Sequence, residues 1–173
     1  MDIEHLKNSI RNIPDYPKPG IQFKDITPIL QNPELFGNVI DIFYDRYKNE
    51  KIDVILGIES RGFIFAAPLA LKLGCSLAIA RKPGKLPYET VSAEYSLEYG
   101  VDTLELHTDA FKPGEKVLIM DDLLATGGTA KAAGELVKKL KGDIVCFSFF
   151  INLVELKGID MLKPHPTFCI VEY

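Results

Sequence analysis

Two acidic residues and the small polar turn that follows them are the part of the sequence best suited to chemistry. The stretch at residues 117–136 reads VLIMDDLLATGGTAKAAGEL, with Asp121 and Asp122 ahead of Thr126-Gly127-Gly128-Thr129. Glycines let the backbone approach a ligand closely, and unpaired N–H groups at a helix N-terminus favour an anion. Carboxylates would repel a phosphate but accept hydrogen bonds from sugar hydroxyls. The pattern therefore predicts a site for a phosphorylated ribose, with the phosphate in the turn and the diol on the acids.

The turn lacks the patterns of the common nucleotide-binding loops. Neither GxxxxGK[ST] nor GxGxxG occurs in it, so a triphosphate held in the P-loop manner is not expected. The alternative interpretation is a solvated acidic pair that caps a helix beside a glycine-rich turn. The position of the pair directly after the buried run VLIM favours the ligand site.

The elements that must position these residues alternate between strand and helix. Strands are expected at 53–60, 75–81, 116–122 and 143–153, with helices at 62–74 and 129–142. Continuous apolar strands that alternate with helices predict a parallel sheet covered by helices. Ligands bind beyond the carboxyl ends of such strands. Three of the expected strands end in polar, turning sequence at that edge: IESRG, ARKPGK and MDDLLATGG.

The remaining segments flank this core. Residues 1–12 predict a short helix that ends at the turn IPDYPKPG, where three prolines and a glycine disfavour regular structure, and 33–49 predicts a longer helix. Residues 82–110 predict a mobile loop followed by an antiparallel hairpin, with Tyr99-Gly100 near its turn. A long loop inside a compact domain is commonly functional.

Composition excludes several classes of protein. The chain has 173 residues, 47% of them hydrophobic and 25% charged, with a net charge of −4, as expected for one soluble globular domain. It has no basic block for nucleic acid, no apolar run long enough for a membrane and no secretory signal. Three cysteines in apolar runs predict reduced core thiols and a cytoplasmic location. The three histidines are far apart, so a protein-held zinc site is not expected.

VLIMDDLLATGGTA resembles the motif with which the purine and pyrimidine phosphoribosyltransferases bind 5-phosphoribosyl-1-pyrophosphate (PRPP). That motif is an apolar strand, two acids and T-G-G-T or T-G-G-S. Further segments resemble the adenine-specific branch of the family, so that the resemblance covers about residues 13–150: YPKPGIQFKDITPIL, GIESRGFIFAAPLA, RKPGKLP and YSLEYGVDTLELH.

The resemblance implies a type I phosphoribosyltransferase fold for a single domain, residues 1–173. This fold is α/β, with a mostly parallel twisted sheet flanked by helices. Its parts would be an N-terminal hood that binds the base at about 1–35, a PRPP-binding core at about 50–155 and a flexible loop and hairpin at 82–107. The implied reaction converts adenine and PRPP to AMP and pyrophosphate, with Mg²⁺ as cofactor. A homodimer is implied too, because a basic residue of the loop can reach the neighbouring subunit's site.

The resemblance also assigns residues to each part of the substrates. By this resemblance the 5′-phosphate of PRPP or AMP would be bound by Ala125, Thr126, Gly127, Gly128 and Thr129, and the ribose by Asp121 and Asp122. Pyrophosphate would be bound by Ser60, Arg61, Arg81, Lys82 and Lys85. The family's cis peptide bond is expected at Glu59–Ser60. Adenine would stack on Phe23 and would also contact the main chain of Lys24 and Leu123. Gln22 departs from the family pattern, which has an apolar residue before the phenylalanine.

Glu98 is the expected catalytic residue, acting on a proton at the purine N7, and Tyr99 beside it would cover the site. Glu94 is an equally plausible acid from pattern alone, and only the SLEYG match favours Glu98. Loop 82–99 would close over PRPP and exclude water. Mg²⁺ would have no direct protein ligand and would bridge PRPP oxygens, reaching Asp121 or Asp122 only through water.

Three rival interpretations remain distinct from this one. A phosphoribosyltransferase for another base would share the PRPP site but not IQFKDI and SLEYG. A regulator could keep the fold to sense PRPP, although no basic helix pair for DNA is present. A phosphoacceptor receiver domain would carry its paired acids in the first strand, and here they fall late in the chain.

Overall fold

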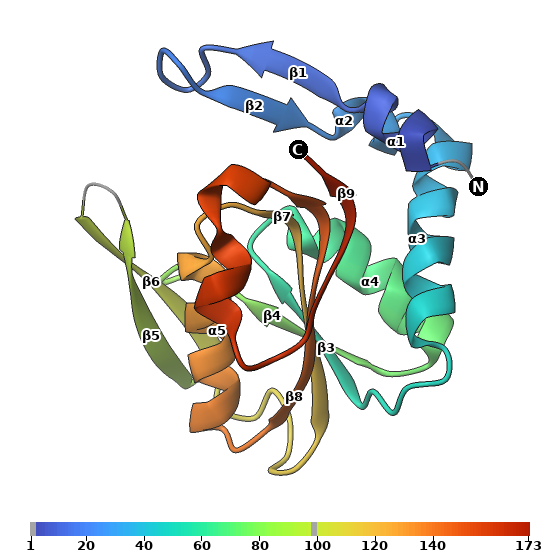
Figure 1. Ribbon diagram of the computed structural model, residues 1–173. Helices are drawn as coiled ribbons and strands as arrows, with labels where there is room; N and C mark the ends of the chain where they lie inside the picture. Colours follow the sequence, from blue (N-terminus) through green and yellow to red (C-terminus); the bar gives the residue numbers. More distant parts are fainter. Residues whose placement is uncertain (1–2, 98–99) are drawn as a thin grey trace.

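A five-stranded parallel sheet forms the centre of the protein, shown in a computed structural model that describes residues 3–97 and 100–173 (Figure 1). The strand order is β4-β3-β7-β8-β9, and every neighbouring pair is parallel. The strands are β3 (Val54–Ile58), β4 (Ser76–Ala80), β7 (Lys116–Leu124), β8 (Asp143–Asn152) and β9 (Thr167–Glu172). The prediction of a mostly parallel α/β fold is confirmed, and all four expected core strands are present.

Helices cover both faces of this sheet (Figure 1). On one face α3 (Pro33–Tyr47) and α4 (Gly62–Leu73) bury Phe43 and Phe65 against Phe150 of β8. On the other face α5 (Gly128–Lys139) buries Leu136 against Phe149 of the same strand. Successive strand residues point to opposite faces, so two apolar faces require the unbroken apolar runs seen in the sequence.

Local signals define one end of each of the helices α3 and α4. Asn32 caps α3, its side chain accepting the N–H groups of Glu34 and Leu35, and Pro33 occupies the first turn. Gly74 ends α4 at φ 72°, a left-handed conformation that glycine adopts without a Cβ clash. In the part of the chain that the structure describes, no helix is both long and apolar enough to cross a bilayer.

The N-terminal segment forms a small hood above the carboxyl ends of the strands (Figure 1). It contains α1 (Ile3–Ser9), a hairpin of β1 (Arg11–Pro14) and β2 (Gln22–Asp25), and α2 (Thr27–Leu30). The predicted short helix is present as α1, but it ends at Ser9 and not at residue 12, and the start of the predicted turn is strand, because β1 runs from Arg11 to Pro14. Pro14 is tolerated because it is the last residue of a short strand in a two-stranded sheet.

A second hairpin, β5 (Thr90–Leu97) and β6 (Gly100–His107), lies beside α5 (Figure 1). The predicted antiparallel hairpin is therefore confirmed, while the residues expected near its turn fall partly outside the described residues. Sequence analysis missed the C-terminal elements: two short 3₁₀ helices, η1 (Val154–Leu156) and η2 (Gly158–Leu162), and the edge strand β9.

Candidate active site

Strand β7 continues through both acids to Leu124, two residues beyond the predicted end of the strand. Its pairing with β8 persists as far as Leu124 opposite Asn152, which keeps the acids in extended backbone. Neighbouring strand residues face opposite sides of a sheet, so Asp121 and Asp122 do not point the same way. The two side chains nevertheless stay close, because Asp121 Oδ1 accepts the backbone N–H of Asp122 at 2.8 Å.

Asp121 faces the glycine-rich turn. It lines a cavity of about 80 Å³ together with residues 123–130 and Phe149. In that turn Gly127 has φ 87° and directly precedes α5. A Cβ on Gly127 would lie 2.6 Å from the carbonyl oxygen of Gly158, so only glycine fits between the turn and η2. The cavity therefore combines a carboxylate with the N-terminus of α5, where N–H groups and the helix dipole favour an anion.

Asp122 faces the start of α4 and the hood. Its Oδ2 lies 2.9 Å from Nε of Arg61, and its side chain is 5% exposed. None of the described residues, Arg61 included, donates a well-aligned hydrogen bond to Asp122 Oδ2. The Arg61 guanidinium carbon also lies 5.2 Å from the centre of the Phe23 ring, a cation–π contact. Arg61 thus joins an acid of the core to an aromatic ring of the hood.

Burial shapes the protonation of both acids. Burial and the neighbouring charge of Asp122 raise the pKa of Asp121 well above its usual range. Burial also raises the pKa of Asp122, although the Arg61 guanidinium opposes the shift. A close acid pair of this kind is suited to a cation or to hydroxyl donors. Among residues 3–97 and 100–173, no three His, Cys, Asp or Glu side chains group closely enough to hold a metal ion by themselves.

The turn after β3 lies next to β7. Its Glu59–Ser60 peptide bond is cis, as the resemblance implied. Helix α4 then begins at Gly62, so the backbone of Ser60 and Arg61 lies at a helix N-terminus. A Cβ on Gly62 would come 2.7 Å from the carbonyl oxygen of Met120, which shows how closely this turn approaches β7. The turns after β3 and β7 therefore lie next to each other, and each offers backbone N–H groups at a helix N-terminus, where an anion can bind.

Three basic residues follow β4, and each is paired with an acid. Glu59 contacts Arg81, with 3.5 Å between Nε and Oε2, and forms an ion pair with Lys85. It also accepts the backbone N–H of Lys82 at 2.7 Å. Burial opposes ionisation of Glu59, but the hydrogen bonds from Lys85 and Lys82 hold its pKa below the usual range. Lys82 Nζ lies 2.5 Å from Oδ2 of Asp102 on β6.

A larger cavity, of about 410 Å³, lies between the hood hairpin and the C-terminal segments. It is lined by Gly20, Ile21, Gln22, Lys24, Leu153, Glu155, Leu156 and Tyr173. Lys24 Nζ lies 3.9 Å from the centre of the Tyr173 ring. Phe23, on the opposite face of β2, contacts Tyr16 edge-to-face and Arg61 instead.

Four of these lining residues were missed by sequence analysis: Leu153, Glu155, Leu156 and Tyr173. The signal that could have found the first three was their position directly after β8, at the edge where ligands bind. Tyr173 follows β9, which the sequence did not reveal. The other predicted residue for the base, Leu123, lines the smaller cavity with Asp121.

The predicted acid Glu98 and its neighbour Tyr99 lie outside the described residues. Glu94, the alternative acid, is exposed on β5 and lines a groove against α5 with Gly128 and Lys131. The structure therefore places the residues expected for phosphate, ribose and pyrophosphate at one edge of the sheet. The residues expected for the base are divided, because Phe23 and Lys24 lie on opposite faces of β2 and Leu123 lines the smaller cavity.

A parallel sheet with an acid pair, a glycine-rich turn and a basic segment at its carboxyl edge, under a small hood, defines the phosphoribosyltransferase class. Residues 25–154 match the family model described as phosphoribosyl transferase domain, and the chain belongs to this family.

Relatives and solved structures extend this match over the whole chain. An adenine phosphoribosyltransferase of Chloroflexus aurantiacus is 51% identical over 173 residues, which is 100% of both chains. A crystal structure of adenine phosphoribosyltransferase from Thermoanaerobacter pseudethanolicus has a TM-score of 0.97 at 45% identity, covering 99% of this chain and 100% of that one. The enzyme of Saccharomyces cerevisiae, solved with an imino-altritol bisphosphate and adenine, has a TM-score of 0.93 at 42% identity, covering 97% of each chain.

Proposed function

We propose that this protein is a purine salvage enzyme that converts adenine and PRPP to AMP and pyrophosphate. The observation that carries the proposal is the acid pair and glycine-rich turn at the carboxyl end of β7. Two similarities support the choice of adenine: 51% identity with a full-length adenine phosphoribosyltransferase, and a solved neighbour that contains adenine. The whole chain, residues 1–173, acts as one domain with its hood, core and hairpin.

The phosphoribosyl group binds at the end of β7. Its 5′-phosphate occupies the turn of residues 125–129, where the N-terminus of α5 supplies N–H donors. The ribose hydroxyls donate to Asp121 and Asp122. Asp122 must then share its carboxylate between a hydroxyl and Arg61, which lies 2.9 Å away.

The pyrophosphate binds between the turn after β3 and the basic segment after β4. Ser60 and Arg61 supply backbone donors, and Arg81, Lys82 and Lys85 supply positive charge. The side chains of these three basic residues are 31%, 51% and 45% exposed. Because the basic side chains are partly exposed, a multiply charged pyrophosphate can reach them and compete with Glu59 and Asp102 as their partner.

Adenine binds under the hood, beside Arg61 on the Phe23 face of β2, which is opposite to the face that lines the cavity of about 410 Å³. Phe23 stacks on the base, Leu123 packs from the core, and the main chain of Lys24 pairs with N1 and N6. Guanine and hypoxanthine present the opposite donor and acceptor pattern there. They would leave buried polar groups unpaired, which is the strongest basis for rejecting a similar ligand.

Mg²⁺ is the cofactor of this reaction, and the residues fit it. The two carboxylates at the end of β7 are close, buried and only partly neutralised by Arg61. A hard cation that keeps several waters would suit such a pair if it reached the acids only through water and took its direct ligands from substrate oxygens. When bound, Mg²⁺ neutralises the pyrophosphate leaving group. This chain's own residues hold the ribose and accept its hydroxyl protons in hydrogen bonds.

Displacement at the anomeric carbon passes through an oxocarbenium-like state, as in glycoside hydrolysis. The chain's role is to hold both anionic ends of PRPP and to align the base N9 with that carbon.

Glu98 is the proposed catalytic residue at the base N7, and Tyr99 the residue that covers the site. Changing Glu98→Gln is expected to lower kcat about 10²–10⁴-fold with little change in KM. Glu94→Gln serves as the matched control, and an effect confined to Glu94 would contradict the assignment.

The active assembly is a homodimer in the cytoplasm. Three large apolar side chains support a partner surface at α4 and the edge strand β4. They are Leu71 of α4, Leu77 of β4 and Tyr88 in the segment after β4, and they are 85%, 43% and 57% exposed. The three cysteines carry free thiols, as expected in a reducing compartment. Light scattering tests the dimer: Leu71→Glu is expected to halve the mass in solution, and an unchanged mass would contradict this surface.

The decisive test of the function is nucleotide formation from PRPP and Mg²⁺ with adenine, guanine, hypoxanthine, uracil and orotate in parallel. AMP from adenine alone is expected. Product from a different base would keep the phosphate and ribose assignments and overturn those of Phe23 and Lys24. PRPP binding without any product would instead favour the regulator.

A further inference from the structure

Glu59 lies between the two parts of the proposed pyrophosphate site. It directly follows β3 and directly precedes Ser60 and Arg61, whose backbone lies at the start of α4. Its own backbone N–H donates to the carbonyl of Ala80, at the end of β4, at 2.9 Å. Its side chain is 9% exposed and contacts the basic segment of residues 81–85. Glu59 therefore belongs to one part of the site by sequence and to the other by its contacts.

The two oxygens of the Glu59 carboxylate hold different parts of this segment. Oε2 accepts the backbone N–H of Lys82 at 2.7 Å and lies 3.5 Å from Nε of Arg81. Oε1 forms an ion pair with Lys85, whose side chain is 45% exposed. Burial raises the pKa of Glu59, but the hydrogen bonds from Lys85 and Lys82 lower it by more, so the carboxyl is ionised. One contact therefore fixes the main chain of the segment, and the other holds the end of a long side chain.

The remaining contacts attach the segment to the second hairpin. Arg81 and Glu105 of β6 exchange backbone hydrogen bonds at 2.9 and 2.7 Å. The Glu105 side chain also accepts the N–H of Gly84 at 3.2 Å, and the Arg81 guanidinium donates to the carbonyl of Lys85 at 3.4 Å. In the part of the chain that the structure describes, the hydrogen bonds from this segment to the turn after β3 all end on the Glu59 carboxylate.

The main-chain contact differs from the ion pair in what it offers a ligand. The Lys85 ammonium has three N–H donors and is partly exposed, so a pyrophosphate can compete with Glu59 for it. The Lys82 N–H is a single donor bonded to a buried carboxylate, so this contact sets where the segment lies. Side chains that already lie near their bound positions lose less conformational entropy when a ligand arrives. A segment held by its main chain should therefore bind an anion more tightly than one that is not held.

We propose that Glu59 is a positioning residue for pyrophosphate. Through the N–H of Lys82 it fixes the segment of residues 81–85 beside the turn after β3, so that the basic side chains are in place before the ligand binds. This inference rests on the proposed function. The negative charge of Glu59 acts in the opposite direction, because it repels the anion. The structure favours the positioning effect, because Arg81 and Lys85 already offset that charge.

Calorimetry on the intact protein, with Mg²⁺ present, measures the Kd of pyrophosphate and, separately, that of ribose 5-phosphate. In the proposed function ribose 5-phosphate binds at the turn after β7, so it reports damage that is not specific to the pyrophosphate end. Glu59→Ala removes both contacts and is expected to raise the Kd of pyrophosphate about ten-fold or more. The Kd of ribose 5-phosphate should stay within about two-fold. In turnover, KM for PRPP should rise and kcat should change less.

Two conservative variants separate the two contacts. Glu59→Gln keeps an oxygen that can accept the Lys82 N–H but loses the charge that pairs with Lys85. Its Kd for pyrophosphate should stay within about three-fold of the wild-type value. Glu59→Asp keeps the charge but is one methylene shorter, which draws the carboxylate back from the N–H, and it should raise the Kd about three-fold or more. These two variants also carry the test if Glu59→Ala folds poorly by circular dichroism.

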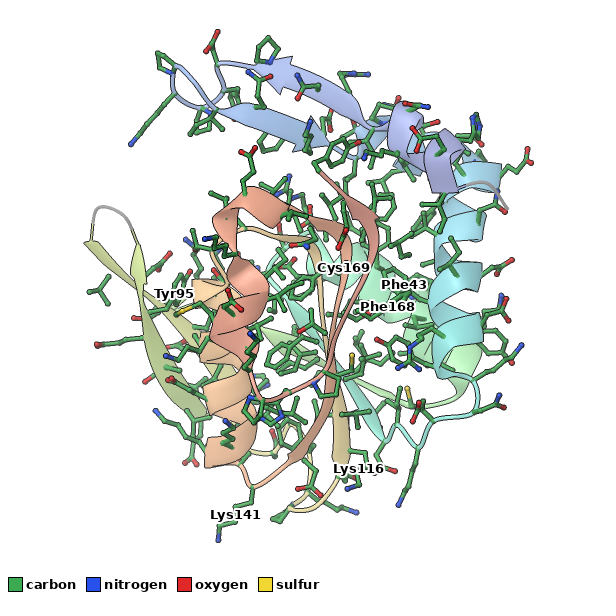
Figure 2. The ribbon with its side chains drawn as sticks, in the orientation of Figure 1. Phe43, Tyr95, Lys116, Lys141, Phe168 and Cys169 are labelled. Carbon is green, nitrogen blue, oxygen red and sulfur yellow. The ribbon has the colours of Figure 1, made fainter. Side chains whose placement is uncertain are left out.

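Asp53→Ala is the matched control. The Asp53 carboxylate likewise accepts a backbone N–H, that of Lys116, at 2.8 Å. Figure 2 shows Lys116 at the end of the molecule opposite the hood. The variant therefore removes the same kind of contact from the other edge of the sheet, and it should leave both Kd values unchanged.

The outcomes separate this inference from the function beneath it. Weaker pyrophosphate binding in Glu59→Ala and Glu59→Asp, with Glu59→Gln and Asp53→Ala near the wild type, would support the inference. Unchanged or tighter binding in Glu59→Ala would overturn it, and so would equal losses in Glu59→Ala and Glu59→Gln, because the charge and not the main-chain contact would then matter. Failure of the wild type to bind either pyrophosphate or ribose 5-phosphate would overturn the proposed function as well.

Discussion

The turn after β7 and the hood hairpin β1–β2 face the same edge of the sheet, but they are held in different ways. The turn follows a strand that pairs on both sides, and its Gly127 has no room for a Cβ. The hairpin has two four-residue strands, mostly exposed or half-buried. It meets the rest of the protein through side-chain contacts such as Arg61 with Phe23 and Lys24 with Tyr173.

This contrast matches a division of labour in the proposed reaction. The phosphoribosyl group is common to every member of the family, and a rigid core can hold it in one geometry. The base differs between members, and a small peripheral hairpin can change without disturbing the core. Changes in the turn should therefore impair PRPP binding, whereas changes in the hairpin should impair adenine binding.

The largest effect is expected from Gly127→Ala. The new Cβ would meet the Gly158 carbonyl, and the residue would keep a left-handed φ of 87°. Strain of about 1–3 kcal/mol should appear as a loss of stability and as a 10–100-fold weaker affinity for PRPP. Gly114→Ala is the matched control, since Gly114 has φ 82° and open space around a Cβ. Equal PRPP affinities in the two variants would contradict the role of the turn.

A somewhat smaller effect is expected from Asp122→Asn. The change removes a charged hydrogen-bond acceptor worth about 1.5–3 kcal/mol to a ribose hydroxyl, which corresponds to about a 10–100-fold lower kcat/KM for PRPP. The fold should survive, because the amide oxygen can still accept from Arg61. Initial rates at varied PRPP measure this. Unchanged kinetics would remove Asp122 from the ribose site.

The hood should respond through the base. Phe23→Leu keeps an apolar side chain and loses the aromatic face, whose stacking is worth about 0.5–1.5 kcal/mol. KM for adenine should rise about two- to ten-fold while KM for PRPP stays the same. A parallel rise in both constants would show that hood and core do not act separately.

The smallest effect is expected from Lys24→Met. The substitution removes the ammonium 3.9 Å from the Tyr173 ring, a contact worth about 0.5–1 kcal/mol, and keeps the stem and the main chain. Thermal unfolding should show a slightly lower Tm, and KM for adenine should hold within about two-fold. A large rise in that KM would mean that the side chain, and not the main chain, contacts the base.

The same two regions differ in how far the sequence predicts them. The core strands and the turn were predictable because apolar runs, Gly74 and the DDLLATGGT motif are local signals. The β1–β2 hairpin was not, since its strands are short, carry Pro14 and gain their stability from pairing with each other. Strand β9 was missed too, because its residues become a strand only beside β8.

The pairwise contacts between site residues could be predicted from the sequence even less well than the hairpin and β9. Glu59 and Asp102 hold the basic residues predicted for pyrophosphate, yet they are separated from Lys82 by 23 and 20 positions. Nothing in the local pattern marks either acid as their partner. The same is true of Leu156 and Tyr173, which only the folded chain brings to the hood.

A crystal structure with bound AMP tests the division between core and hood most directly. The account predicts the 5′-phosphate within hydrogen-bonding distance of the backbone N–H groups of residues 126–129, the ribose hydroxyls on Asp121 and Asp122, and the adenine against Phe23. A phosphate bound instead at Arg81–Lys85, or a base bound away from the hood, would contradict it.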